Sequence, residues 1–156
     1  MAFEDLPDTV PGDEADGACV LDPAYRIDGE VPLGDFFSAI RGLLPQDTTL
    51  YLEGGRFEPS LADFIDATSV PERLHIAYGT ISPRPHTWHL PATDDVLAAI
   101  AAQLGTKRRV PFAYHVHFYD SDGVLLWWHD AGANDIVLSR RFGDANARCL
   151  EDRLNS

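Results

Sequence analysis

Cysteine is scarce in this sequence. The chain has two cysteines, Cys19 and Cys149, which stand far apart and share no Cys-x-x-Cys or Cys–His spacing. A disulfide framework needs paired cysteines and a zinc finger needs closely spaced ligands, so neither is predicted. The sequence also lacks the common catalytic patterns. Gly54 and Gly55 have no P-loop lysine beside them, and Ser139 lies in no G-x-S-x-G turn.

Basic residues are also few. The chain has 12 lysines and arginines against 25 acidic residues, which gives a formal net charge of -13. Nucleic-acid backbones and anionic membranes attract clustered basic side chains, and the short run Lys107–Arg109 is too small for that purpose. We therefore expect no nucleic-acid partner and no membrane partner. A basic protein partner is favoured by the charge.

Long apolar runs are missing. No stretch approaches the roughly 18 apolar residues that span a bilayer, and the start MAFEDLPD lacks the basic and apolar segments of a signal peptide. We therefore expect a cytoplasmic protein. Residues 1–17 are rich in acids, proline and glycine, which predicts a loosely ordered N-terminal arm. Residues 18–156 have the size and composition of a single globular domain.

Hydrophobic periodicity predicts both helices and strands. Apolar residues recur at helical spacing in four segments: 33–45, 58–71, 93–105 and 143–155. Thr93 and Asp144 stand where helix caps are expected, and Gly105 where a helix ends. Strands are predicted over 48–55, 74–81, 112–119, 124–129 and 133–141, with a proline-bracketed edge segment over 82–92. The short turns between strands predict an α+β fold, with a mainly antiparallel sheet and about four helices packed largely on one face.

The segment HVHFYDSDGVLLWWHDA, residues 115–131, is the most distinctive part of the chain. Alternation places Phe112, Tyr114, Val116 and Phe118 on a core face, and it favours a three-residue loop, Ser121–Gly123, that sets Val124, Leu126 and Trp128 beside them. On the other face, this register pairs His115 with His129, His117 with Trp127, and Tyr119 with Leu125. Three imidazoles then converge there.

The histidine face has three interpretations. His115, His117 and His129 are candidate ligands of zinc or another divalent metal, with Asp130 as a candidate general base and Asp120 as a group that orients a ligand. Without a metal, the same face is a pocket or a contact surface. Ordinary packing of a covered sheet face also accounts for the pattern.

We favour a small acidic binding domain with no cofactor, rather than an enzyme. Its contact surface is the aromatic and histidine face of the hairpin, and its partner is another protein or a second copy of the chain. The alternative is a metal-dependent hydrolase or lyase on the same hairpin. The expected binding face comprises His115, His117, Tyr119, Trp127 and His129, joined by His86, Trp88 and His89.

Overall fold

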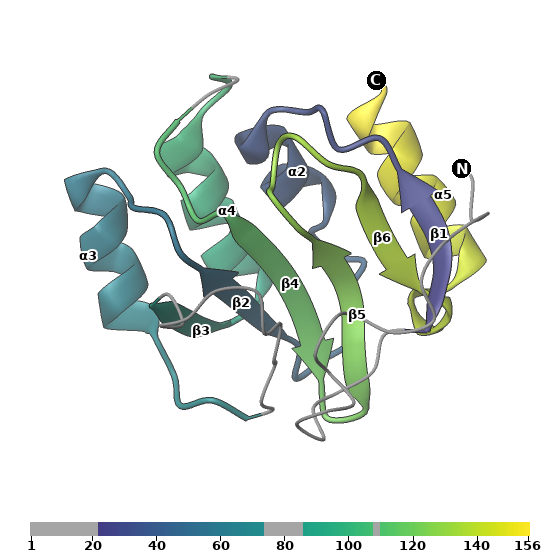
Figure 1. The fold of residues 1–156 in the computed structure, drawn as a ribbon, viewed down its shortest axis with the longest axis horizontal. Coiled ribbons are helices and arrows are strands. Elements are labelled where there is room, and N and C mark those ends of the chain that lie inside the picture. The colour runs from purple at the N-terminus through teal and green to yellow at the C-terminus, as the bar shows by residue number, and fades with distance from the viewer. Residues whose placement is uncertain (1–21, 74–85, 108–109) are drawn as a thin grey trace.

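Six strands form one antiparallel sheet in the computed structural model, which describes residues 22–73, 86–107 and 110–156 (Figure 1). The strand order across the sheet is β1-β6-β5-β4-β2-β3. The predicted arm and the predicted strand over 74–81 lie outside the described residues. The strands are β1 Pro23–Ile27, β2 Thr49–Glu53, β3 Thr87–Pro91, β4 His115–Asp120, β5 Gly123–Trp128 and β6 Ile136–Ser139.

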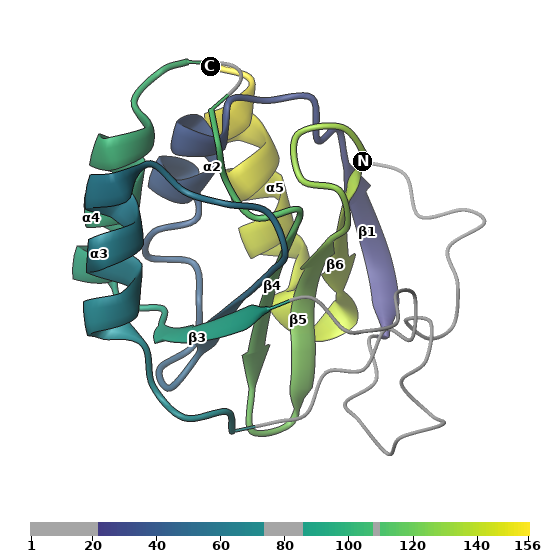
Figure 2. The same cartoon turned by 60° about the vertical axis from the view of Figure 1, so that its left-hand side comes forward.

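The described part of the chain has four α-helices, and they lie on one face of this sheet (Figure 2). This confirms the predicted α+β fold. None of the described helices has the length and apolar character of a membrane span. The helices are α2 Leu33–Ala39, α3 Pro59–Thr68, α4 Asp94–Leu104 and α5 Asp144–Leu154, and a short 3-10 helix, η1, covers Arg140–Phe142.

The main core lies between the helices and the sheet. Phe36 of α2 sits against the indole of Trp128 on β5, with ring centroids 4.6 Å apart, and both side chains are fully buried. Leu50 and Leu52 of β2 face the same core. At Gly34 an added Cβ would lie 2.0 Å from the carbonyl oxygen of Gly105, so the absence of a side chain there lets α2 approach the end of α4.

The helix ends follow the sequence signals in part. The Thr93 hydroxyl accepts the backbone N–H of Val96 at 3.3 Å, and Gly105 ends α4 with a φ of 64°. The predicted Asp144 cap is wrong, because Gly143 occupies the N-cap position and Asp144 pairs with Arg148 one turn later. The first helix is shorter than predicted and stops at Ala39.

Two strand boundaries also differ from the prediction. β1 was not predicted, because PAYRI has no clear alternation and forms a strand only by pairing with β6. β4 starts at His115, one residue after Tyr114. Tyr114 is 60% exposed and therefore does not belong to the core face on which it was predicted. β3 is an edge strand beside β2, as its flanking prolines indicate.

The hairpin register is correct at its centre and wrong at its tip. His117 pairs with Trp127, as predicted. Nearer the turn, however, the register shifts and Tyr119 pairs with Val124 instead of Leu125. The chain reverses across Asp120 and Gly123, and the extra residue is absorbed by a bulge in β5. The bulge changes the alternation, so Val124 lies outside the helix-side core.

Candidate functional site

The sheet face away from the helices carries a buried group of polar and aromatic side chains. The pairing of β2 with β3 and β4 brings residues from three strands together, because Tyr51 lies opposite both His89 and His117. His117 and Tyr51 are fully buried, and Glu53 is 1% exposed. We name this group the histidine cluster: Tyr51, Glu53, His89, His115, His117, Tyr119, Trp127 and His129.

Six of the eight residues predicted for a binding face lie in the histidine cluster, and two do not. Trp88 points to the opposite face, where its ring lies 4.8 Å from that of Phe57 and packs against the main core. His86 is exposed and contacts Trp88. His89 joins the cluster because side chains alternate along β3. Most of the cluster is buried, so it does not form an open contact surface in this structure.

Glu53 connects two parts of the cluster. The Tyr51 hydroxyl donates a hydrogen bond to Oε1 of Glu53, and Oε2 of Glu53 lies 3.9 Å from Nε2 of His115. Nδ1 of His115 accepts the backbone N–H of Asp130 at 2.9 Å. That bond requires Nδ1 to be unprotonated, so the neutral ring carries its proton on Nε2 and directs it toward the Glu53 carboxylate.

A second chain of hydrogen bonds runs to the edge of the cluster. The Tyr119 hydroxyl lies 2.8 Å from Nδ1 of His89 and accepts the backbone N–H of Arg73 at 3.3 Å. The tautomer of His89 decides whether Tyr119 or Nδ1 of His89 donates in this bond. Nε2 of His89 lies 3.9 Å from a carboxylate oxygen of Glu72.

Three histidines of the cluster favour the neutral form. Burial lowers the pKa of His115 and His129, although Glu53 and Asp130 act in the opposite direction on both. Burial lowers the pKa of His117 well below its usual value, and the neighbouring His115 and His129 lower it further. A proton on any of these rings therefore costs more free energy in the folded protein than in water.

The three predicted metal ligands lie together, but their rings are not directed at one point. His115 and His129 stack with centroids 3.8 Å apart and an interplanar angle of 17°. Stacked rings hold their nitrogen lone pairs in nearly parallel planes, whereas a shared zinc needs both lone pairs to converge at about 2.0–2.1 Å. Across residues 22–73, 86–107 and 110–156, no three His, Cys, Asp or Glu side chains are arranged to hold a metal ion. Metal binding stays a prediction that requires these rings to reorient.

The two aspartates named beside the metal site have other contacts. Asp130 contributes its backbone N–H to His115 and has a left-handed φ of 53°, which aspartate tolerates better than most residues. Asp120 pairs with Arg141 at 2.5 Å. Asp130 acts on His115 and His129 through its charge, and Asp120 is paired with Arg141. The predicted roles of the two carboxylates as base and orienting group stay predictions.

Replacing Tyr119 with phenylalanine should lower the free energy of unfolding by about 1–3 kcal/mol, because the change leaves Nδ1 of His89 and the N–H of Arg73 without their shared partner. Chemical denaturation measures the loss. Amide hydrogen exchange at Arg73 should also become faster. Tyr114→Phe, at an exposed position, serves as the control, and an equal effect of the two variants would contradict this role of the Tyr119 hydroxyl.

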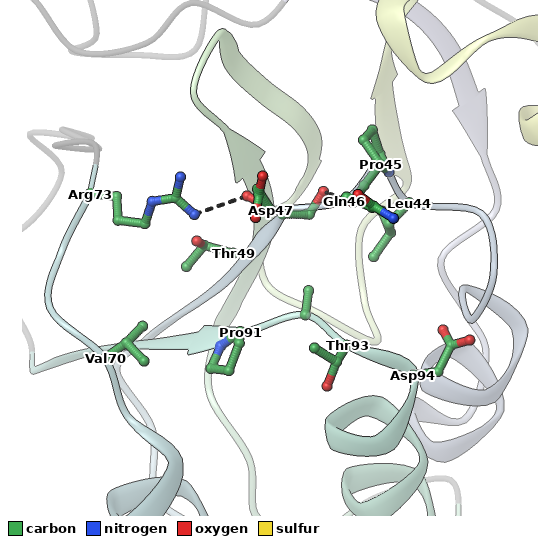
Figure 3. Close-up of a pocket in the computed structure, with 12 residues that line it drawn as sticks. Leu44, Pro45, Gln46, Asp47, Thr49, Val70, Arg73, Pro91, Thr93 and Asp94 are labelled. Atoms are coloured by element: carbon green, nitrogen blue, oxygen red, sulfur yellow. Dashed lines mark hydrogen bonds between the residues drawn. The ribbon is translucent and has the colours of Figure 1, made fainter.

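A pocket of about 520 Å³ opens at the end of the sheet where β2 begins and β3 ends (Figure 3). Three segments that are distant in sequence line it: 44–49, 91–94, and the stretch after α3 that contains Val70 and Arg73. The backbone N–H of Val70 bonds to the carbonyl of His89, which ties the pocket wall to the histidine cluster. None of the described residues that line the pocket belongs to the predicted binding face.

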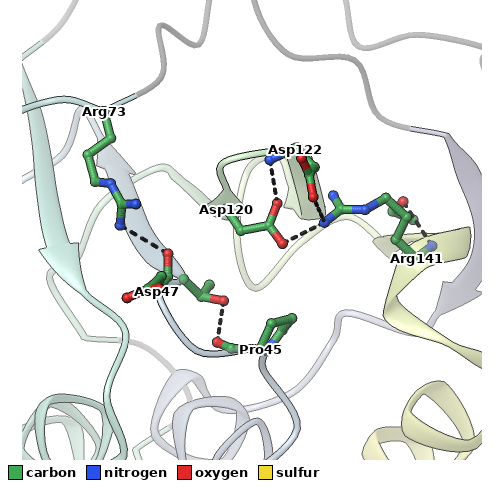
Figure 4. Close-up of polar contacts among 8 residues, drawn as sticks. Pro45, Asp47, Arg73, Asp120, Asp122 and Arg141 are labelled. Carbon is green, nitrogen blue, oxygen red and sulfur yellow. Dashed lines mark hydrogen bonds and ion pairs between the residues drawn. The ribbon is translucent and has the colours of Figure 1, made fainter.

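Aspartates and arginines lie together around this end of the sheet (Figure 4). Nη1 of Arg73 donates to the backbone carbonyl of Asp47 at 3.1 Å, not to its carboxylate. Arg141 is held between Asp120, at 2.5 Å, and Asp122, at 3.7 Å. Asp47 and Asp94 line the pocket itself, so the described part of its walls carries two carboxylates and one guanidinium.

Sequence reasoning missed Tyr51, Glu53 and the pocket. The alternation of Thr49, Tyr51 and Glu53 with Leu50 and Leu52 does indicate a second, more polar face of β2. That β2 lies between β3 and β4 is a property of the sheet order, which local patterns do not contain. Comparisons with protein-family models, with curated proteins and with solved structures found no match for this chain.

Proposed function

We propose that this chain is a small acidic binding domain whose partner is a basic protein. The pocket at the end of the sheet, together with the carboxylates around it, is the observation that carries the proposal. It replaces the hairpin face as the contact surface, because the histidine cluster is largely buried and the pocket is open. The histidine cluster is bonded to the pocket wall through the backbone N–H groups of Val70 and Arg73.

Charge supports this choice of partner. The chain carries a net charge of -13, and the pocket end of the sheet presents Asp47, Asp94 and Asp122 on exposed loops or helix ends. Such a surface attracts a basic partner over a distance of about 10 Å at 0.1 M salt and repels acidic competitors. Apolar pocket walls supply contact area that charge alone does not.

The experiment compares partner capture by three forms of the full chain. Wild-type protein, the double variant Asp47→Asn/Asp122→Asn, and the control Asp63→Asn/Asp66→Asn are immobilised and exposed to extract of the source cells. Both variants lose two negative charges, but the control loses them on α3, away from the pocket. Captured proteins are quantified by mass spectrometry at low and high salt.

We expect wild type and the α3 control to capture the same basic protein, and the pocket variant to capture about tenfold less of it. Binding should weaken as salt screens the carboxylates. Equal capture by the pocket variant would contradict the proposed surface. Capture of only further copies of this chain, with a dimer seen by light scattering, would instead support self-association and overturn the proposal.

A further inference from the structure

We propose that the pocket receives a lysine or arginine side chain of the partner, an inference that rests on the proposed function. The pocket combines a buried hydroxyl, carboxylates on its rim and apolar walls. A long basic side chain matches all three features, because it carries a cationic head on an aliphatic stem.

The Thr49 hydroxyl is the first contact for the cationic head. Thr49 is 2% exposed and lies at the first position of β2, where its side chain faces the pocket (Figure 3). Among the described residues this hydroxyl has no hydrogen-bond partner. A donor group that enters the pocket can therefore bond to this oxygen in place of water.

Asp47 supplies the charge. Its φ of 64° places the residue in the left-handed region, and its backbone carbonyl is held by Arg73. Its carboxylate has no ion-pair partner within the described ranges of the chain. Asp94 adds a second carboxylate, which is fixed by the backbone N–H of Gly42 at 3.0 Å. An ammonium or guanidinium group beside Asp47 would form charge-assisted hydrogen bonds, which are stronger than neutral ones, and Asp94 would add to the negative charge of the pocket.

The apolar part of the pocket fits the stem of such a side chain. Leu44, Val70, Pro91 and Ala92 line the walls, and all four are partly buried. Contact between the methylene groups of lysine or arginine and an apolar surface lowers the free energy of the complex, while the charged head keeps its hydrogen bonds. The pocket volume of about 520 Å³ lies within the usual range of binding sites, about 300–1,000 Å³.

An anionic ligand fits less well. The N-terminus of α4 reaches the pocket, and a helix N-terminus attracts anions. Here, however, Asp94 and Asp95 already occupy the first turn, and Thr93 bonds to the N–H of Val96. Among the described residues that line the pocket, Arg73 is the one cation, against two carboxylates. The balance favours a positively charged occupant.

The test uses short capped peptides as probes of the full-length protein. Acetyl-Ala-Lys-Ala-amide is compared with the norleucine peptide, which keeps the stem and lacks the ammonium, and with the glutamate peptide. Binding is followed by NMR through the amide signals of Thr49, Arg73 and Thr93. We expect saturable shifts with the lysine peptide only. Asp47→Asn should weaken binding about tenfold and should keep the backbone, because asparagine also tolerates a positive φ.

Thr49→Val removes the hydroxyl at nearly constant side-chain shape and should also weaken binding of the lysine peptide. Asp63→Asn on α3 should leave that binding unchanged. Equal binding of the norleucine or glutamate peptide would overturn the inference, and so would tighter binding of free cadaverine than of the lysine peptide. If Asp47→Asn has no effect on the lysine peptide while partner capture still depends on the acidic surface, the proposed function stands and this use of the pocket fails.

Discussion

Trp128→Ala is expected to lower the free energy of unfolding by about 3–5 kcal/mol, which is the typical cost of removing a large buried aromatic side chain. The indole is fully buried, its ring lies 4.6 Å from that of Phe36, and Nε1 donates to the carbonyl of Asn134 at 2.8 Å. The change would empty the centre of the core and leave that carbonyl without its donor. Since domains of this kind are stable by about 5–15 kcal/mol, much of the native stability would be lost.

Urea denaturation of wild type, Trp128→Phe and Trp128→Ala measures this effect. The phenylalanine variant keeps most of the packing but loses the hydrogen bond, so its stability should fall between the other two. Tyr114→Ala removes an aromatic ring that is 60% exposed and should change stability little. Similar losses for Trp128→Ala and Tyr114→Ala would show that the core is not organised around Trp128.

Acidification is expected to destabilise the protein below about pH 6.5, before most carboxylates titrate. Burial lowers the pKa of His115, His117 and His129 in the folded state, while the unfolded chain keeps values near 6.5. Below pH 6.5 the unfolded state therefore binds more protons, and stability falls as pH falls. The loss grows until pH reaches the lowered pKa of each folded histidine. Each histidine that stays neutral in the folded state contributes up to about 1.4 kcal/mol per pH unit.

His117→Phe isolates one part of this dependence. The free energy of unfolding is measured by urea titration at pH 7.5, 6.5 and 5.5 for wild type, His117→Phe and the exposed control His86→Phe. The His117 variant should lose about 1 kcal/mol less than wild type between pH 6.5 and 5.5, because an unfolded histidine is only half protonated at pH 6.5. A slope equal to that of wild type would mean that His117 is protonated as readily in the folded protein as in the unfolded chain.

Local sequence patterns were sufficient for the fold class but not for the site. Helical spacing and the Thr93 cap located α4, and alternation paired His117 with Trp127, because these features depend on neighbours in the chain or across one turn. β1 forms a strand only by pairing with β6, which is distant in the sequence. The bulge near Tyr119 depends on how a two-residue turn is accommodated at the hairpin tip. Neither is visible in a short window of sequence.

Six of the eight residues of the histidine cluster were predicted. The hairpin from His115 to His129 supplied five of them by alternation, and the proline-bracketed segment supplied His89. Tyr51 and Glu53 belong to the cluster because β2 pairs with β4. Trp88 does not belong to it, because its side chain lies on the helix side of β3. The pocket was not predicted, since segments from three separate loops form it. Such contacts are fixed by tertiary packing and not by periodicity.

The pairing of β1 with β6 affects the order in which the strands can form. Arg140 and Asp22, which meet beside this pair, are 118 positions apart. Closing so long a loop costs conformational entropy before stabilising contacts between the two strands can form. This strand pair is therefore expected to form late in folding. During synthesis β1 leaves the ribosome before every other described strand, yet it must wait for the last of them. Until then the edge of β6 stays unpaired, and the nascent domain is most exposed to edge-to-edge association.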